Sequence, residues 1–314
     1  MKPAQSAARA LAVINYMTVH PRMAFTLSEL ATGLGVSPAS MSAVLLALSE
    51  SGYLARDARH RTYVLGPALV AAGHGASERH PVIEAARAEL IRLAEFGSEC
   101  VGSAAVGDDM MMLAIEGRPS GRSRESWIGQ RIPLMPPFGQ VFIAWANDSV
   151  VDEWLGRLSP ESVVALRGEL LRSLGEVRQR GVAIGLRNEP VEEVIELIHR
   201  TSSDAGSVTR EELGRLIPRQ AIDYALHEIG ADERYDVANL AAPVFGPDGT
   251  VVFAMTLTGV NGIRGADLSD LCDEMRGGAR AVAKSIGGRA PAMAGAWSSP
   301  AVGIGERASA KPQC

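Results

Sequence analysis

Residues 6–66 carry three short amphipathic segments followed by a two-stranded pattern, and this order constrains the fold more than any other feature of the chain. The first segment, Ser6–His20, has apolar residues at helical spacing and stops before Pro21. The second begins at Thr26, which forms a capping-box pattern with Glu29, in which each side chain satisfies the other residue's free backbone N–H. The spacing therefore predicts two successive helices.

A third helix is predicted after Ser37-Pro38, because serine is a favoured N-cap and proline suits the first helical position. Gly33 and Gly35 provide the turn that precedes it, and Gly52 ends it. Two short helices joined by a glycine-containing turn are typical of a helix-turn-helix. The predicted buried face of the third helix consists of Met41, Val44, Leu45 and Leu48.

The outward face of the third helix and the hairpin after it are the candidate DNA-contacting surfaces. Strand-forming residues 53–56 and 61–65 flank a polar turn at 57–60, which predicts a β-hairpin, or wing. The N-terminal end of such a helix enters the major groove, and guanidinium groups on a wing suit phosphates or a narrow minor groove. The residues predicted to contact DNA are Ser37, Ala39, Ser40, Ser42 and Ala43 on the helix and Arg56, Arg59 and Arg61 on the wing.

Small side chains on the helix predict weak direct base readout. Serine bonds to base edges or phosphates alike, and no arginine, asparagine or glutamine lies on that face. We therefore expect more reliance on phosphate contacts, half-site spacing and DNA shape. The alternative interpretation is a polar helix surface beside a solvated charged turn.

The charge distribution and length favour a DNA-binding head on a larger body. The 314 residues are about twice the usual length of one domain. The net charge is −5, yet residues 1–77 carry six basic and three acidic side chains, which leaves the acidic excess in the remainder. The predicted boundaries are a winged helix-turn-helix at 1–66, a linker helix and hinge at 67–81, a second domain at 82–287 with an apparent helical insertion at 190–234, and a disordered tail at 288–314.

The second half predicts an α+β domain, because helices alternate with antiparallel hairpins. Its predicted helices cover 82–96, 139–146, 160–181 and 267–286, with further helical stretches at 191–198 and 211–226 inside the insertion. Its predicted strands cover 99–106, 110–115, 128–133, 182–186, 237–245 and 250–257. The absence of an apolar run of about 18 residues and of a signal-peptide pattern predicts a cytoplasmic protein with no membrane partner.

Several motifs in this order resemble the IclR family of bacterial regulators. In the first half they are Ala7-Ala8-Arg9-Ala10-Leu11, Leu27-Ser28-Glu29-Leu30-Ala31, Ser51-Gly52-Tyr53-Leu54 and Thr62-Tyr63-Val64-Leu65-Gly66. In the second half they are Ile128-Gly129-Gln130-Arg131-Ile132-Pro133-Leu134, Phe138-Gly139, Glu176-Val177-Arg178-Gln179-Arg180-Gly181, Ala241-Ala242-Pro243-Val244-Phe245 and Asp248-Gly249.

The resemblance implies a GAF-like effector-binding domain with a mixed or antiparallel sheet and flanking helices. It also implies homodimers or homotetramers and control of nearby genes, as a repressor or activator, by a small molecule that is often an organic or aromatic acid. Three features depart from the family pattern: the insertion, Pro136-Pro137 before the effector-domain helix, and Asn239, where a small residue or cysteine is commoner.

Five residues are the candidates for binding an effector. Phe138 and Gly139 precede a predicted helix, whose free backbone N–H groups would attract a carboxylate. Asn239, Thr256 and Thr258 alternate with apolar residues, so they could face one side of the sheet and orient a small ligand. The alternative is that they are ordinary sheet threonines and a core asparagine with satisfied hydrogen bonds.

No catalytic, cofactor or metal motif is recognisable in the sequence, so neither an enzyme nor a cofactor is expected. Cys100, Cys272 and Cys314 are widely spaced and odd in number, which favours reduced thiols over disulfides or a zinc site. Two other classes of protein stay open: an enzyme with an N-terminal assembly domain, and a winged-helix module that binds another protein.

Overall fold

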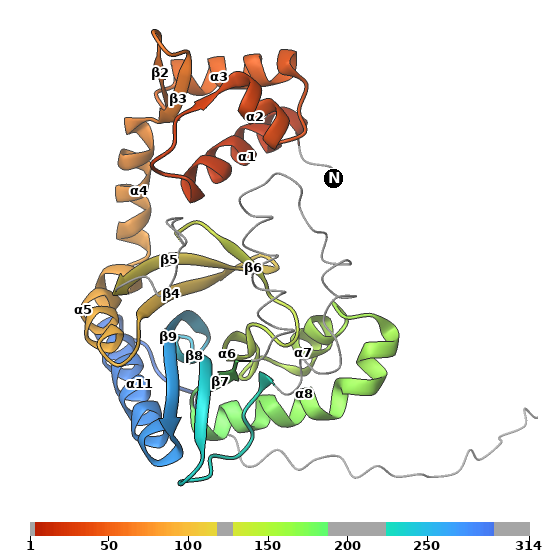
Figure 1. Ribbon diagram of the computed structural model, residues 1–314, viewed down its shortest axis with the longest axis vertical. Coiled ribbons are helices and arrows are strands. Elements are labelled where there is room, and N and C mark those ends of the chain that lie inside the picture. Colours follow the sequence, from red (N-terminus) through yellow and green to blue (C-terminus); the bar gives the residue numbers. More distant parts are fainter. Residues whose placement is uncertain (1–3, 118–127, 188–223, 292–314) are drawn as a thin grey trace, which may run out of the picture.

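The computed structural model describes residues 4–117, 128–187 and 224–291 (Figure 1). The N-terminal domain has three helices, α1 (Gln5–Val19), α2 (Leu27–Gly33) and α3 (Pro38–Glu50). It also has a small antiparallel sheet in the order β1-β3-β2, formed by β1 (Phe25–Thr26), β2 (Leu54–Asp57) and β3 (Thr62–Leu65). The fully buried residues of its core include Val13, Leu30, Met41 and Leu45.

The predicted caps set the starts of α2 and α3. The Thr26 hydroxyl accepts a hydrogen bond from the Glu29 backbone N–H at 3.3 Å, and the Glu29 carboxylate accepts one from the Thr26 N–H at 2.7 Å. Ser37 Oγ accepts from the Ser40 N–H at 3.4 Å, with Pro38 at the first helical position. These observations confirm the capping box and the second cap that the residue types indicated.

The angle between α2 and α3 is that of a helix-turn-helix. The two helices are bent by 115° at their break, within the usual range of about 90–120°. No single helix in the described part of the chain is long and apolar enough to cross a membrane. The α2–α3 pair meets that test of length and composition only when its two members are counted together.

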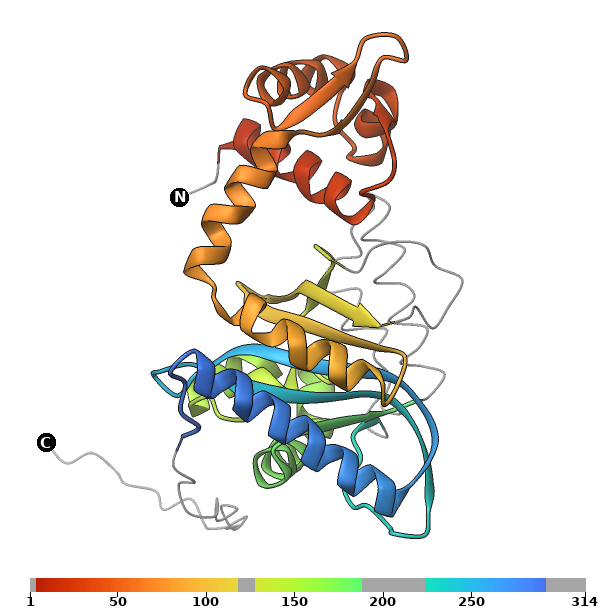
Figure 2. The same cartoon turned by 90° about the vertical axis from the view of Figure 1, so that its left-hand side faces the viewer.

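A long helix connects the two domains. Helix α4 (Pro67–Arg79) descends from the N-terminal domain to α5 (Val82–Ala94) in both views (Figures 1 and 2). His80 leaves helical geometry, with φ −122° and ψ 62°, because the ring of Pro81 disfavours the α conformation at the preceding residue. No residue of α4 is buried in this chain.

Within the described residues, the second domain is built on one six-stranded sheet in the order β6-β5-β4-β9-β8-β7, with every neighbouring pair antiparallel. Its strands are β4 (Glu99–Val106), β5 (Asp109–Gly117), β6 (Arg131–Pro133), β7 (Ala183–Leu186), β8 (Arg234–Phe245) and β9 (Val251–Arg264). The observed α+β class agrees with the prediction, and the sheet is antiparallel.

Two sets of helices cover the two faces of this sheet. Helices α5 and α11 (Gly265–Ser285) lie side by side on one face, as Figure 2 shows, and enclose the larger core. The opposite face meets a second apolar cluster, formed with the segment around α6 (Gln140–Ile143), α7 (Asp148–Leu155) and α8 (Pro160–Arg180). Because successive strand residues point to opposite faces, the strands carry apolar residues for both clusters.

Close packing in the larger core requires a glycine in β4. A Cβ atom on Gly102 would lie 2.2 Å from the ring carbon Cζ of Phe253, which is itself fully buried. Glycine therefore leaves the space into which the aromatic ring packs across the strands.

Several predicted boundaries differ from the structure. The predicted helix at 139–146 is only the four-residue α6, and β1 was not anticipated. Of the predicted insertion, 190–223 lies outside the described residues. The helix predicted at 211–226 does not extend to residue 226. Ala225 forms an isolated β-bridge with Gly185, and the Leu226 N–H donates to the Ile184 carbonyl at 3.2 Å.

The predicted C-terminal tail begins with defined contacts. The Gly288 N–H donates to the Ala283 carbonyl at 2.7 Å, and the Arg289 N–H donates to the Gly246 carbonyl at 3.1 Å. These bonds tie the end of α11 to the turn between β8 and β9. Residues 292–314 of the predicted tail lie outside the described residues.

Candidate functional site

The recognition face of α3, meaning its outward side, carries half of the predicted DNA-contacting residues. Ala39, Ser42 and Ala43 are exposed, whereas Met41 and Leu45 on the opposite side are fully buried. Ser40 is half-buried. A helix with such a division presents small groups outward while its apolar stripe anchors it to the domain.

Ser37 acts first as a helix cap. Its hydroxyl oxygen accepts from the Ser40 N–H at 3.4 Å, and its proton goes to Ser40 Oγ at 3.1 Å. Ser37 is exposed, so a phosphate could still approach its backbone N–H, but its side chain is occupied within the domain. Ser42 is the more open of the predicted serine contacts.

The wing orders its backbone through Asp57. One carboxylate oxygen accepts from the backbone N–H groups of Arg59 at 2.7 Å and His60 at 3.1 Å, and the other lies 2.8 Å from His60 Nδ1. Hydrogen bonding to the His60 side chain, supported by these two N–H groups, lowers the pKa of Asp57. The single carboxylate of the wing is therefore engaged by groups of the turn between β2 and β3.

One of the three wing arginines, Arg61, differs in setting from the sequence prediction. Arg61 was expected to open a strand, but it has φ 56° and belongs to the turn, because β3 begins at Thr62. Arg56 lies on β2 with its guanidinium carbon 5.8 Å from the centre of the Tyr63 ring, a cation–π distance. Arg59 and Arg61 are both exposed at the tip.

The candidate effector residues of β8 and β9 share one face of the large sheet. Asn239 pairs directly with Thr258, and Ala241 pairs with Thr256. Paired residues in an antiparallel sheet point to the same side, and so do residues two apart on one strand. Asn239, Thr256 and Thr258 therefore lie together on the face that α6 covers, as their alternation predicted. We call this the sensor face.

A tyrosine that no sequence pattern marked completes this group. Tyr224 is buried, and its hydroxyl oxygen accepts a hydrogen bond from Asn239 Nδ2. Its ring lies 6.1 Å from that of Phe138 in an edge-to-face arrangement. Burial raises the pKa of Tyr224 to about 12, so the phenol stays neutral. Phe138, Tyr224 and Asn239 thus converge from three distant segments of the chain.

Two further polar residues on the sensor face were also missed. Gly129 and Gln130 form a glycine bulge opposite Met112: the Gly129 N–H donates to the Met112 carbonyl at 2.8 Å, and the Met112 N–H donates to the Gln130 carbonyl at 3.0 Å. Gln130 is 3% exposed, and its side-chain oxygen has no hydrogen-bond partner within the described ranges. Ser103, which is also 3% exposed, lies on β4 and pairs with Met112 across the edge of β5 opposite to Gln130.

Gly139 precedes a helix that is shorter than the one predicted at 139–146. Helix α6 spans only the four residues Gln140–Ile143, so few peptide dipoles are aligned in it. Gly139 has φ 77°, and a Cβ there would lie 2.1 Å from Leu134 Cδ1, so the segment is packed against its neighbours. Carboxylate binding at Gly139 stays a prediction, and Phe138 itself contacts Tyr224.

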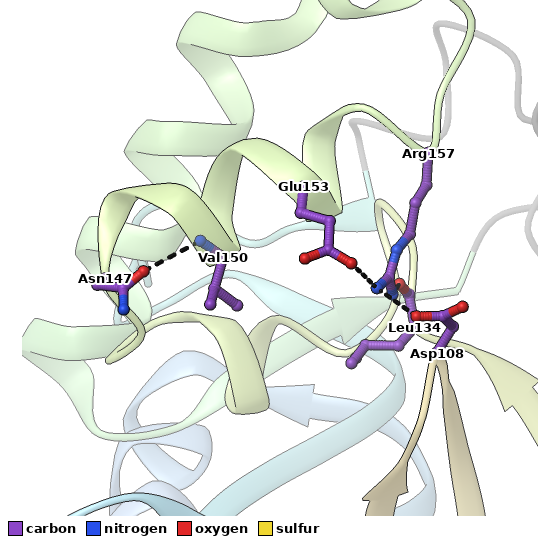
Figure 3. Close-up of polar contacts among 6 residues, drawn as sticks. All are labelled: Asp108, Leu134, Asn147, Val150, Glu153 and Arg157. Atoms are coloured by element: carbon purple, nitrogen blue, oxygen red, sulfur yellow. Dashed lines mark hydrogen bonds and ion pairs between the residues drawn. The ribbon is translucent and has the colours of Figure 1, made fainter.

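Arg157 holds together three of the segments that lie around the sensor face. Its guanidinium donates to the Leu134 carbonyl, to Asp108 Oδ1 at 2.9 Å and to Glu153 Oε1 at 3.3 Å, as Figure 3 shows. The side chain is 16% exposed, so these bonds are partly shielded from water. One arginine thus joins the β4–β5 turn, the segment before Phe138 and the end of α7.

The N-cap of helix α7 and a tryptophan within the helix also form hydrogen bonds in this region. Asn147 Oδ1 accepts from the Val150 N–H at 3.1 Å at the helix start (Figure 3). The buried Trp154 donates its indole N–H to the Phe138 carbonyl at 3.1 Å. The backbone of Phe138 is therefore positioned from outside while its ring meets Tyr224.

The two domains also meet away from the linker. A Cβ atom on Gly129 would lie 2.6 Å from Thr18 Cγ2 and 3.7 Å from Val19 Cγ1, both at the end of α1. The same glycine is hydrogen-bonded to Met112, whose side chain belongs to the apolar cluster on the sensor face. The pair Gly129 and Met112 therefore connects the sensor face to the end of α1 in the N-terminal domain.

The potential metal ligands of the described residues do not gather at one point. No cluster of three or more histidine, cysteine, aspartate or glutamate side chains suited to a metal ion occurs among them. Cys100 and Cys272 are free and buried, and burial raises their pKa values to about 12 and about 11, so both thiols stay protonated. Cys314 lies outside the described residues.

Comparisons with known proteins identify the N-terminal domain and the fold. Residues 6–58 match the model of the IclR helix-turn-helix domain. A transcriptional regulator from Alicyclobacillus acidocaldarius has TM-score 0.59 and 22% identity, covering 91% of this chain and 100% of its own. HmgR of Pseudomonas aeruginosa has TM-score 0.57 and 20% identity, covering 90% and 100%.

A third similar structure contains a small molecule. It is an IclR homologue from Microbacterium hydrocarbonoxydans complexed with 4-hydroxybenzoate, with TM-score 0.59 and 15% identity, covering 90% of this chain and 99% of its own. Among curated proteins, none is similar enough to match this chain. Because the sequence identities are this low, the similar structures show a shared fold alone.

Proposed function

We propose that this chain, which has an IclR helix-turn-helix domain and the fold of IclR-type transcriptional regulators, binds operator DNA with an affinity that a small-molecule effector controls. The observation that carries the proposal is the match over residues 6–58, the segment that contains α2, the turn and α3. The proposed domains are residues 1–66 for DNA binding, 67–81 as linker and 82–287 for the effector.

The proposed DNA contacts come from the recognition face and the wing. Ser37, Ala39, Ser40, Ser42 and Ala43 let α3 approach the bases closely, and Arg56, Arg59 and Arg61 supply positive charge beside it. Few of these groups discriminate bases, so two symmetric half-sites would multiply a modest specificity.

Self-association therefore belongs to the proposal. Helix α4 has no buried residue in a single chain, which leaves its surface available to a second copy. We expect light scattering of the full chain at micromolar concentration to give at least the mass of a dimer, and its complex with upstream DNA to hold at least two protomers. A monomer whose mass stays unchanged on DNA would contradict this part of the proposal.

The proposed effector is a small, partly apolar organic or aromatic acid, bound on the sensor face without chemical change. Phe138 and Tyr224 offer aromatic surface, and the hydroxyl of Thr256 and the amides of Gln130 and Asn239 offer neutral hydrogen-bonding groups. The buried side-chain oxygen of Gln130, which has no partner among the described residues, would accept from a hydroxyl or N–H group on the ligand. The 4-hydroxybenzoate of the similar structure combines these features and is the first probe to test.

The effector would act by favouring one arrangement of the two domains. Helix α4 is one connection, and the contact between Gly129 and Thr18 is a second and shorter one. Because Gly129 is bonded to Met112 in the strand beneath the sensor face, a small shift there would reach α1 directly.

Removing the two tip arginines should flatten the salt dependence of DNA binding. In the double variant Arg59→Ala plus Arg61→Ala, each lost phosphate contact should reduce the slope of log affinity against log salt by about 0.9 for each wing. Fluorescence anisotropy at several salt concentrations measures this slope. The control, Arg167→Ala plus Arg172→Ala on α8, removes the same charge far from the wing and should leave the slope unchanged. An unchanged slope in the wing variant would mean that the wing does not touch DNA.

A further inference from the structure

One large apolar side chain stands out on the recognition face of α3. Leu46 is 60% exposed. A single exposed leucine is ordinary on a protein surface, so what distinguishes Leu46 is its place on this helix. The outward residues that precede it, Ala39, Ser42 and Ala43, are all small. Leu46 is therefore the longest side chain that this part of the helix presents to the outside.

Helical spacing places Leu46 on the same side as the predicted DNA contacts. Ala39, Ala43 and Leu46 follow each other at intervals of four and three residues, which line one face of a helix. Leu46 lies roughly 12 Å along the axis from Pro38, two turns from the N-terminal end that enters the groove. The residues before it on this face, Ala39 and Ala43, are small, so they would not hold Leu46 away from the base edges.

The chemistry of the major groove offers one apolar partner to such a side chain. Every base pair presents hydrogen-bond donors and acceptors there, but only thymine adds an apolar group, its C5-methyl. A leucine cannot bond to the polar edges, so its burial against them would leave donors or acceptors without partners. Packing against a methyl group removes apolar surface from water on both sides.

We propose that Leu46 reads thymine, by packing its side chain against the C5-methyl group of a thymine in each operator half-site. The inference rests on the proposed function and deepens it, because it names the base that the recognition helix selects. It supplies direct readout on a helix whose serines and alanines discriminate little.

The test uses duplexes selected by the full-length chain from a random DNA library. Each thymine of a selected half-site is replaced in turn by deoxyuridine, which lacks only the methyl group. At one position per half-site, we expect the wild-type chain to lose about fourfold in affinity, the value of one buried methyl, and about 15-fold when both half-sites are substituted. In Leu46→Ala this loss should disappear, so that thymine and deoxyuridine duplexes bind equally.

Leu11→Ala is the matched control, because Leu11 has the same exposed fraction, 60%, but lies on α1. Its ratio of thymine to deoxyuridine affinity should equal that of the wild type, whatever its absolute affinity. Thermal unfolding should show that both variants remain folded, since neither side chain is buried. Equal deoxyuridine sensitivity in Leu46→Ala and wild type, or none in the wild type, overturns the proposal while DNA binding stands. Failure of the library selection to yield any bound sequence overturns the proposed function itself.

Discussion

Replacing Ser42 with glutamate should lower the affinity of the full chain for its operator by at least about 100-fold. Ser42 is exposed on the recognition face of α3, so the new carboxylate would face the phosphates and the acceptor-rich base edges. Opposed like charges in an interface cost several kcal/mol, and each 1.4 kcal/mol is tenfold in affinity. Anisotropy titration with a fluorescent operator duplex measures the loss.

The control for Ser42→Glu is Ser149→Glu, which adds the same charge in the first turn of α7, on the surface of the other domain. That variant should bind DNA within about twofold of wild type, because charges beyond a Debye length of about 8 Å are largely screened. If Ser42→Glu binds as tightly as Ser149→Glu, α3 does not enter the groove and the proposed orientation of the domain on DNA is wrong.

Replacing Thr256 with valine should remove most of the effector response while leaving ligand-free DNA binding intact. Thr256 is half-buried on the sensor face, and valine keeps its shape but cannot bond to a ligand. An effector typically changes the affinity for the other ligand by about 5- to 150-fold. In Thr256→Val, we expect the effector to change operator affinity by about 5-fold or less. The measurement is operator affinity with and without 4-hydroxybenzoate, or a compound found by thermal shift of the full chain.

Thr258→Val provides the graded comparison. The Thr258 hydroxyl already donates to the Glu99 carbonyl at 3.3 Å, so its loss should affect the ligand response less than the loss of Thr256. Asn239→Leu is a less specific test, because it would also leave the buried Tyr224 hydroxyl without the amide that donates to it. If Thr256→Val keeps the full response to a confirmed ligand, the effector lies elsewhere.

The N-terminal domain could be predicted closely because its signals are local. Thr26, Ser37 and Pro38 fix helix starts through bonds or dihedral angles within three residues, and the burial of Met41 and Leu45 follows from helical periodicity. The strand β1 escaped prediction because two residues carry no periodicity. Its pairing with Thr62 and Tyr63 is a tertiary contact.

The sensor face could be predicted only in part, for the same physical reason. Alternation along β8 and β9 placed Asn239, Thr256 and Thr258 on one side, since that spacing is a property of any strand. Tyr224 and Gln130 reach this face through chain connections and a bulge that no local pattern marks. The helix predicted at 139–146 was too long, because α6 ends at Ile143 in a segment packed closely around Gly139.

The most direct test of the central claim is the affinity of the full chain for one selected operator duplex and for a scrambled duplex of the same composition, each measured over a range of salt concentrations. The account predicts that both affinities fall steeply as salt rises and that the operator is bound at least about 1,000-fold more tightly than the scrambled duplex. Equal affinity for the two duplexes, or binding that does not change with salt, would contradict it.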